Sequence, residues 1–171
     1  MLEAKIVDRS QLCEILRPLR QRGQRIVLTN GCFDLLHVGH VKSLEAAKAE
    51  GDCLVVGLNS DRSVRALKGE GRPIMTAKDR AVVLAGLASV DYVTIFEETD
   101  PQALIQEVQP DVLVKGADWV PDRMVGKEIV EGAGGIVKTV PYVEGHSTRA
   151  MIDRIRQRGT AKSGTRKAIQ S

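Results

Sequence analysis

The eleven residues 30–40 constrain the fold of this chain more than any other stretch. They read Asn-Gly-Cys-Phe-Asp-Leu-Leu-His-Val-Gly-His, and the segments on either side differ in character. Residues 25–29 form a short segment rich in β-branched residues, which predicts a buried strand. Residues 41–50 are rich in helix formers and have apolar residues at 41, 44 and 47, which predicts a helix. The stretch is therefore expected to be a strand-to-helix loop whose last residues form the first helical turn.

A loop in that position is suited to binding an anion. Unpaired backbone N–H groups and the positive end of the helix dipole face a ligand there. His37 and His40 lie three residues apart, so both imidazoles are aimed at that ligand. Gly39 removes a side chain where a phosphate needs to come close. The loop is predicted to handle phosphate.

Length and hydrophobicity restrict the class of protein. A chain of 171 residues suits one domain with a real core. No apolar run approaches the roughly 18–20 residues of a membrane span, and the polar N-terminus has no secretory hydrophobic region. Three cysteines at unpatterned spacing imply no disulfide framework. We expect a cytoplasmic protein without a membrane partner.

Charge is distributed unevenly along the chain. The net charge of +3 comes from 25 basic and 22 acidic residues, and five of the basic ones follow from Arg156 onward with no acidic residue. The body is therefore slightly acidic, which argues against a nucleic-acid partner. The folded domain is expected to cover residues 1–158, and residues 159–171 are expected to form a basic, disordered tail.

Apolar segments alternate with helical patterns over the rest of the chain. This alternation predicts parallel β-α-β units, and so a doubly wound, Rossmann-like α/β fold of about five strands with its ligand at the carboxyl ends of the strands. Neither a Gly-x-Gly-x-x-Gly motif after the first strand nor a Gly-x₄-Gly-Lys-Ser/Thr motif occurs. The expected strands are 25–29, 53–58, 92–96, 112–114 and 136–140, and the expected helices are 10–22 (capped by Ser10), 41–50 (stopped by Gly51), a short one ending at 67, 76–88 (capped by Thr76 and Asp79), 101–108 (capped by Asp100), 126–131 and 147–158.

The pattern Gly-x-Phe-Asp-x-x-His-x-Gly-His at residues 31–40 resembles the signature of the nucleotidyltransferase superfamily that uses a His-x-Gly-His motif. The body from about residue 25 to 155 is similar, more specifically, to the adenylyltransferase half of the bifunctional heptose kinase/adenylyltransferases. Segments that carry this likeness are 29–34, 59–61, 64–69, 71–74, 79–81, 87–93 and 114–119, with 125–126, 134–135 and 143–145 in the carboxyl part. The resemblance implies transfer of AMP from ATP to D-glycero-β-D-manno-heptose 1-phosphate, giving ADP-heptose for the lipopolysaccharide inner core. It also implies a homodimer and, since no sugar-kinase domain is present, a separate heptose kinase.

The site residues follow from the motifs and from this resemblance. The expected catalytic residues are His37, His40, Lys68 and Arg80. The expected nucleotide-binding residues are Asn30, Gly31, Cys32, Phe33, Asp34, Gly39, Lys115, Gly116, Asp118, Ser147 and Thr148. The expected acceptor-binding residues are Asn59, Arg72 and Asp34.

Several of these residues also have a simpler structural interpretation. The histidines are alternatively helix caps, or metal ligands with Cys32 and Asp34, although the spacing lacks an ordinary zinc pattern. Cys32 is more simply a small packed residue than a reactive thiol. Ser147 or Thr148 is alternatively an N-cap, and Lys68 and Arg72 are alternatively solvated. The third residue of the second motif is Arg149, where relatives usually have threonine.

The predicted chemistry needs alignment rather than a general base. A phosphomonoester is already largely dianionic at pH 7, so the protein must align the acceptor oxygen with the α-phosphorus and neutralise charge on the leaving pyrophosphate. Histidines, cations, helix N-termini and Mg²⁺ carried by the triphosphate suit that task. Two alternatives are a cytidylyltransferase that uses CTP and glycerol 3-phosphate, and a catalytically silent nucleotide-binding module.

Overall fold

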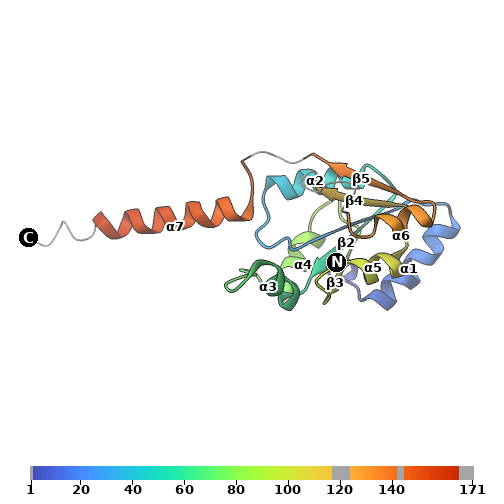
Figure 1. Cartoon of the computed structure of the whole chain (residues 1–171), viewed down its shortest axis with the longest axis horizontal. Coiled ribbons are helices and arrows are strands. Elements are labelled where there is room, and N and C mark those ends of the chain that lie inside the picture. The colour runs from blue at the N-terminus through green and yellow to red at the C-terminus, as the bar shows by residue number, and fades with distance from the viewer. Residues whose placement is uncertain (1, 117–123, 142–144, 166–171) are drawn as a thin grey trace, which may run out of the picture.

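A five-stranded parallel sheet organises the chain. The computed structural model describes residues 2–116, 124–141 and 145–165, the last seven as backbone only (Figure 1). The strand order is β3-β2-β1-β4-β5, and every neighbouring pair is parallel. This confirms the predicted doubly wound fold. The strands are β1 Ile26–Gly31, β2 Cys53–Asn59, β3 Tyr92–Phe96, β4 Val112–Gly116 and β5 Ile136–Val140.

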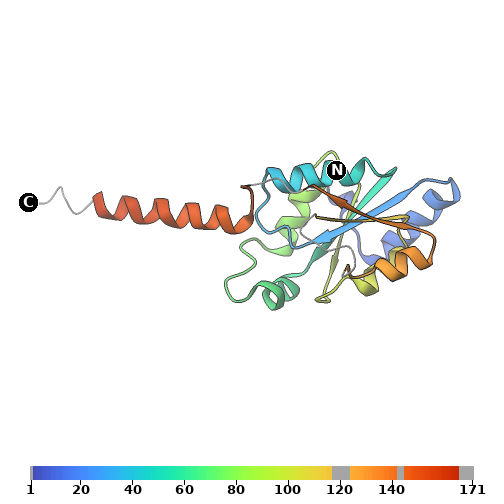
Figure 2. The same ribbon diagram turned by 45° about the horizontal axis from the view of Figure 1, so that its top comes forward.

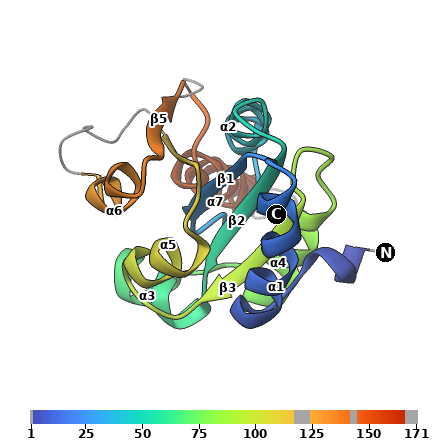
Figure 3. The ribbon, with the colours of Figure 1, turned by 90° about the vertical axis from the view of Figure 1, so that its right-hand side faces the viewer.

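Helices cover both faces of the sheet, which explains the continuous apolar runs of β1 and β2. One core cluster joins alternate strand residues such as Val27 to helices α2 (Val38–Lys48) and α4 (Ala77–Ala85). The other joins Ile26 and Leu28 to α1 (Arg9–Gln21), α5 (Gln102–Val108) and α6 (Lys127–Gly132). Figure 3 shows α5 and α6 on one side of the sheet and α2 and α4 on the other. The remaining helices are a 3-10 turn η1 (Leu2–Lys5), α3 (Asp61–Lys68) and α7 (Thr148–Thr165).

Side-chain caps fix most helix starts, but two predicted N-caps are wrong. Pro101 and not Asp100 is at the N-cap position of α5, although Asp100 Oδ1 accepts from the Gln102 N–H at 2.9 Å. Helix α1 is capped by Asp8 and not by Ser10: the Asp8 carboxylate accepts from the Gln11 backbone N–H, and the Gln11 side chain accepts from the Asp8 N–H. This reciprocal capping box is favoured over a Ser10 cap because it satisfies two backbone donors at once. Thr76 caps α4 as predicted, but its hydroxyl donates to the Asp79 carboxylate, so the box is not reciprocal.

The predicted helix ends are less accurate than the starts. Helix α4 ends at Ala85 and not at about residue 88, and α2 ends at Lys48, before Gly51. A Cβ at Gly51 would lie 2.7 Å from the Arg25 carbonyl oxygen. Gly51 is therefore needed for close approach of the α2–β2 connection to the start of β1, rather than to end the helix.

Helix α7 is longer than predicted and projects from the body as a single rod (Figures 1 and 2). It continues to Thr165, beyond the expected end at Arg158. Local propensity does not account for this extension, since two of its residues are Gly159 and Gly164. The predicted disordered tail is thus helical as far as Thr165, and residues 166–171 lie outside the described part. Among the described residues, no helix combines the length and apolar character needed to span a bilayer.

Candidate functional site

The predicted phosphate loop lies at the carboxyl end of the sheet, where the strand order reverses. Strand β1 lies between β2 and β4, so the loop after Gly31 begins at the topological switch point, where ligands bind in folds of this class. The start of α7 reaches the same place, because the Thr148 hydroxyl is 3.5 Å from the Leu35 carbonyl oxygen. Two motifs more than 100 residues apart in sequence therefore meet.

His37 and His40 form a stacked pair. Their ring centroids are 3.8 Å apart with planes 22° from parallel, and the Phe33 ring meets His40 edge-on at 5.2 Å. The Nδ1 atoms of both histidines are buried and lack a hydrogen-bond partner in the described part of the chain. His37 occupies the N-cap position of α2 but makes no side-chain cap bond, so the helix-cap interpretation fails for it.

Both imidazoles are held neutral near pH 7. Burial lowers the pKa of His40 to about 4, and the neighbouring His37 adds to the effect. Burial also lowers the pKa of His37, with a contribution from His146. A neutral imidazole keeps one N–H donor and one acceptor nitrogen. The pair can therefore donate hydrogen bonds to an anion without carrying two positive charges at van der Waals distance.

The structure adds a reason for Gly39 besides the predicted one. A Cβ there would lie 2.9 Å from Cε1 and Nδ1 of His37, and 3.6 Å from the His146 carbonyl oxygen. The missing side chain makes room for the His37 ring and the start of α7.

The Asp34 side chain contacts protein groups and does not face a ligand-binding space. Its side chain is fully buried and accepts from Arg72 Nε at 2.5 Å, from the Ile74 N–H at 2.8 Å and from the Met75 N–H at 3.0 Å. Burial opposes its ionisation, but the Met75 and Ile74 N–H groups and the Arg72 guanidinium outweigh it and lower the pKa of Asp34. The predicted direct contact of Asp34 with nucleotide or acceptor is therefore revised. The carboxylate instead attaches segment 72–75 to the phosphate loop.

The hydrogen-bond donors of Arg80 are likewise directed at protein groups. Its side chain is fully buried and donates to the carbonyl oxygens of Met75 at 3.0 Å, Cys32 at 2.6 Å and Asn59 at 2.9 Å, and to Asp61 Oδ1 at 2.7 Å. These four bonds occupy most of the five N–H donors of a guanidinium. Arg80 therefore does not fit the predicted direct catalytic role.

Asn59 is a further predicted ligand contact with a protein partner. It is 3% exposed, and its side-chain amide donates to Ser63 Oγ at 2.9 Å. We therefore revise its predicted contact with the acceptor to a structural one. Burial of this amide at the end of β2 could not be inferred from its sequence position.

Asn30 and Lys115 meet at the ends of the neighbouring strands β1 and β4, as their predicted shared role requires. The Lys115 ammonium donates to Asn30 Oδ1. Burial lowers the pKa of Lys115 to about 8. Asp118 and Trp119 lie outside the described residues.

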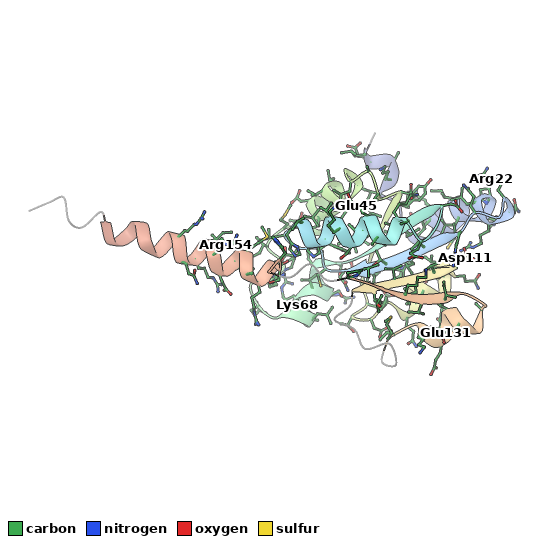
Figure 4. The ribbon with its side chains drawn as sticks, turned by 90° about the horizontal axis from the view of Figure 1, so that it is seen from above. Arg22, Glu45, Lys68, Asp111, Glu131 and Arg154 are labelled. Atoms are coloured by element: carbon green, nitrogen blue, oxygen red, sulfur yellow. The ribbon has the colours of Figure 1, made fainter. Side chains whose placement is uncertain are left out.

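The remaining predicted cations of the site are Lys68 and Arg72. Lys68 is exposed at the end of α3, and Figure 4 shows it at the same end of the body as the base of α7. Arg72 is 19% exposed, and among the described residues only its Nε has a protein partner. Burial raises the pKa of the Cys32 thiol, although the charges of Lys68, Arg80 and Arg72 oppose it. Cys32 is therefore a protonated, packed residue and not a nucleophile.

Ser147 is the N-cap of α7, because its hydroxyl accepts from the Ala150 N–H at 3.1 Å. No group of three His, Cys, Asp or Glu side chains suited to a metal ion occurs within the described ranges. One side chain near the site was not predicted as a site residue: Asp61, whose Oδ1 accepts from Arg80 Nη2. Its position directly after a strand and the Ser60 cap was visible in the sequence, but its partner was not.

Comparison with known proteins decides the family. Residues 28–160 match the family model described as cytidylyltransferase-like, and this range includes the phosphate loop and the base of α7. The chain belongs to the cytidylyltransferase-like family. It is a nucleotidyltransferase by this membership, in agreement with the resemblance found in its motifs.

Individual relatives of this cytidylyltransferase-like chain cover most of its length. It is 54% identical over 154 residues to the bifunctional protein HldE of Geotalea uraniireducens, and 55% identical over 152 residues to that of Koribacter versatilis. These alignments span 90% and 89% of this chain but only 31% of either relative.

Solved structures give the same fold. The lipopolysaccharide core biosynthesis protein from Thermoplasma volcanium superposes with a TM-score of 0.60 and 30% identity, over 72% of this chain and all of that one. The pantoate-beta-alanine ligase of Francisella tularensis, at TM-score 0.57 and 18% identity, covers 80% of this chain and 66% of the ligase, and it supports the fold alone.

Proposed function

We propose that this nucleotidyltransferase moves AMP from ATP to D-glycero-β-D-manno-heptose 1-phosphate, giving ADP-heptose and pyrophosphate. The observation that carries the proposal is the 54% identity to a bifunctional protein HldE across 90% of the chain. The motif resemblance to the adenylyltransferase half of heptose kinase/adenylyltransferases supplies the acceptor. A sugar kinase must then supply the sugar 1-phosphate.

The described residues support an alignment mechanism. The acceptor phosphate attacks the α-phosphorus of ATP, the bond from that phosphorus to the β-phosphate oxygen breaks, and pyrophosphate leaves. His37 and His40, both neutral, donate to phosphate oxygens as negative charge develops. Lys68 and Arg72 neutralise phosphate charge, and the N–H groups at the base of α7 add donors.

Magnesium fits this site as a partner of the nucleotide and not of a protein cage. Asp34 already accepts from three donors, and the described residues contain no cluster of metal-ligating side chains. Mg²⁺ would therefore take its ligands mainly from triphosphate oxygens and water, as it does in many phosphoryl-transfer sites, and would spread the charge of the triphosphate.

Transfer of CMP from CTP to glycerol 3-phosphate is the second candidate, because the matching family model is described as cytidylyltransferase-like. Pyrophosphate release across a panel of triphosphates and acceptors separates the two. We expect kcat/KM for ATP with heptose 1-phosphate to exceed that for CTP with glycerol 3-phosphate by at least roughly 10²-fold. Equal values, or a preference for the second pair, would remove the heptose assignment and leave the nucleotidyltransferase class.

A further inference from the structure

We propose that Asp61 is a positioning residue for nucleotidyl transfer, which acts through Arg80 to hold the phosphate loop and segment 72–75 in register. This inference rests on the proposed function, but it concerns a carboxylate that is not among the residues expected to bind substrate. Its basis is a set of hydrogen bonds among three segments that are far apart in sequence.

The first step is the environment of Arg80. The guanidinium is fully buried, and three of its four partners are neutral carbonyl oxygens. A buried cation with only neutral partners is costly. Asp61 Oδ1, at 2.7 Å from Nη2, supplies the only ion pair of Arg80 within the described residues. The carboxylate therefore fixes both the charge balance and the plane of the guanidinium.

The second step is what that plane determines. With Nη2 directed at Asp61, Nη1 reaches the carbonyls of Cys32 and Asn59, while Nε reaches that of Met75. Cys32 belongs to the phosphate loop and Met75 to the segment that follows Arg72. A planar, rigid fork of donors holds these carbonyls in one fixed arrangement.

The third step is an independent contact on the opposite side of the same segment. Asp34, from the phosphate loop, accepts from the Met75 N–H and from the Ile74 N–H, and it also receives Arg72 Nε. The peptide groups on both sides of Met75 are thus attached to the phosphate loop, one through Asp34 and the other through Arg80. Loss of the Arg80 anchor would leave Asp34 as the remaining hydrogen-bonded connection among the described residues, and the Arg72 guanidinium could shift with the segment.

Asp61 also connects Arg80 to the helix that carries Lys68. Its side chain is 40% exposed, at the first residue of α3, whose last residue is Lys68. Asp61 thus lies at the anchored end of the helix that carries one proposed phosphate cation, and it contacts the arginine that anchors the other. A displacement of about 1 Å at a site of this kind can cost roughly 10²-fold in rate.

The test compares Asp61→Asn with the parent protein. Asparagine keeps the size and one acceptor oxygen but removes the charge. We expect kcat for pyrophosphate release to fall by about 10- to 100-fold, with KM for ATP changed by less than about threefold, since the change acts on alignment rather than on ground-state binding. Asp79→Asn is the matched control: it removes a first-turn helix carboxylate that contacts Thr76 and not Arg80, and kcat should stay parental.

A second readout needs no substrate. In hydrogen exchange, the backbone amides of Ile74 and Met75 should exchange faster in Asp61→Asn than in the parent or in Asp79→Asn. The double variant Asp61→Asn with Arg80→Lys should lose no more kcat than Arg80→Lys alone, because the two residues act through one contact.

Parental kcat and parental amide exchange in Asp61→Asn would overturn the positioning role, as would fully additive losses in the double variant. Failure of the proposed function gives a different pattern. The parent would then fail to use heptose 1-phosphate, whereas the exchange of the Ile74 and Met75 amides would still respond to Asp61→Asn.

Discussion

At the residue scale, the stacked pair His37 and His40 carries the clearest chemical consequence. His40→Ala should reduce kcat by roughly 10²–10³, the loss seen when a transition-state donor is removed. His37→Ala should behave similarly. Neither Nδ1 has a hydrogen-bond partner to lose among the described residues, so any fall in the thermal midpoint should reflect only the lost ring contacts.

The exposed His146 at the base of α7 provides a control for this pair, and His146→Ala should retain most of the turnover. Variants at 37 and 40 that melt much earlier than the parent and yet turn over normally would show that the pair is structural.

The low pKa of His40 also predicts how stability depends on pH. The unfolded chain binds a proton at this residue near pH 6.5, but the folded chain binds it only near pH 4. Acidification between these values therefore favours the unfolded state, and stability at this residue is lost as pH falls. Thermal unfolding from pH 7.5 to 4.5 should show a smaller loss for His40→Asn than for the parent. Identical pH dependence in both would contradict burial of a neutral His40.

At the element scale, the connection between α2 and β2 depends on close backbone approach at Gly51. In Gly51→Ala, the new Cβ would meet the Arg25 carbonyl oxygen at 2.7 Å and Val27 Cγ2 at the same distance. Overpacking of this kind costs about 1–3 kcal/mol in the free energy of unfolding, measurable by urea denaturation. Gly132→Ala is the control, since nothing lies within 4 Å of its Cβ position in α6. A neutral effect at position 51 would show that the connection relaxes freely.

At the scale of the whole molecule, α7 extends beyond everything that forms the core. Among the described residues, both buried clusters end at Val140 or earlier. A chain ending at Gly159 should therefore keep its thermal midpoint and its kcat/KM, provided that Ser147 still caps the first turn of α7.

Sedimentation of the full and shortened chains tests the predicted homodimer in the same experiment. Equal association states with equal activity fit a role confined to the base of α7. Loss of activity or stability, or a change in association, would show that the distal half contacts the site or a second copy.

The sequence by itself determined the five strands, their parallel arrangement and the position of the phosphate loop. Period, β-branching and the Asn30–His40 pattern are local properties, and local patterns predict elements well. The Asn30–His40 pattern also paired His37 with His40, and the family resemblance added Lys68 and Arg72 to the proposed site. Helix ends and the Ser10 cap were predicted less well, since neighbouring residues compete for the same backbone donors.

Only the tertiary structure decided what the buried charges do. Asp34 and Arg80 look like ligand contacts in the sequence because motifs report residue type and not direction. In the fold, Asp34 meets Ile74 and Met75 across 40 or more positions of sequence, and Arg80 meets Cys32 across 48. A buried charge must find its partners wherever the packing places them. Most of those partners are backbone groups, which no motif records, and the two side-chain partners, Arg72 and Asp61, are also distant in sequence.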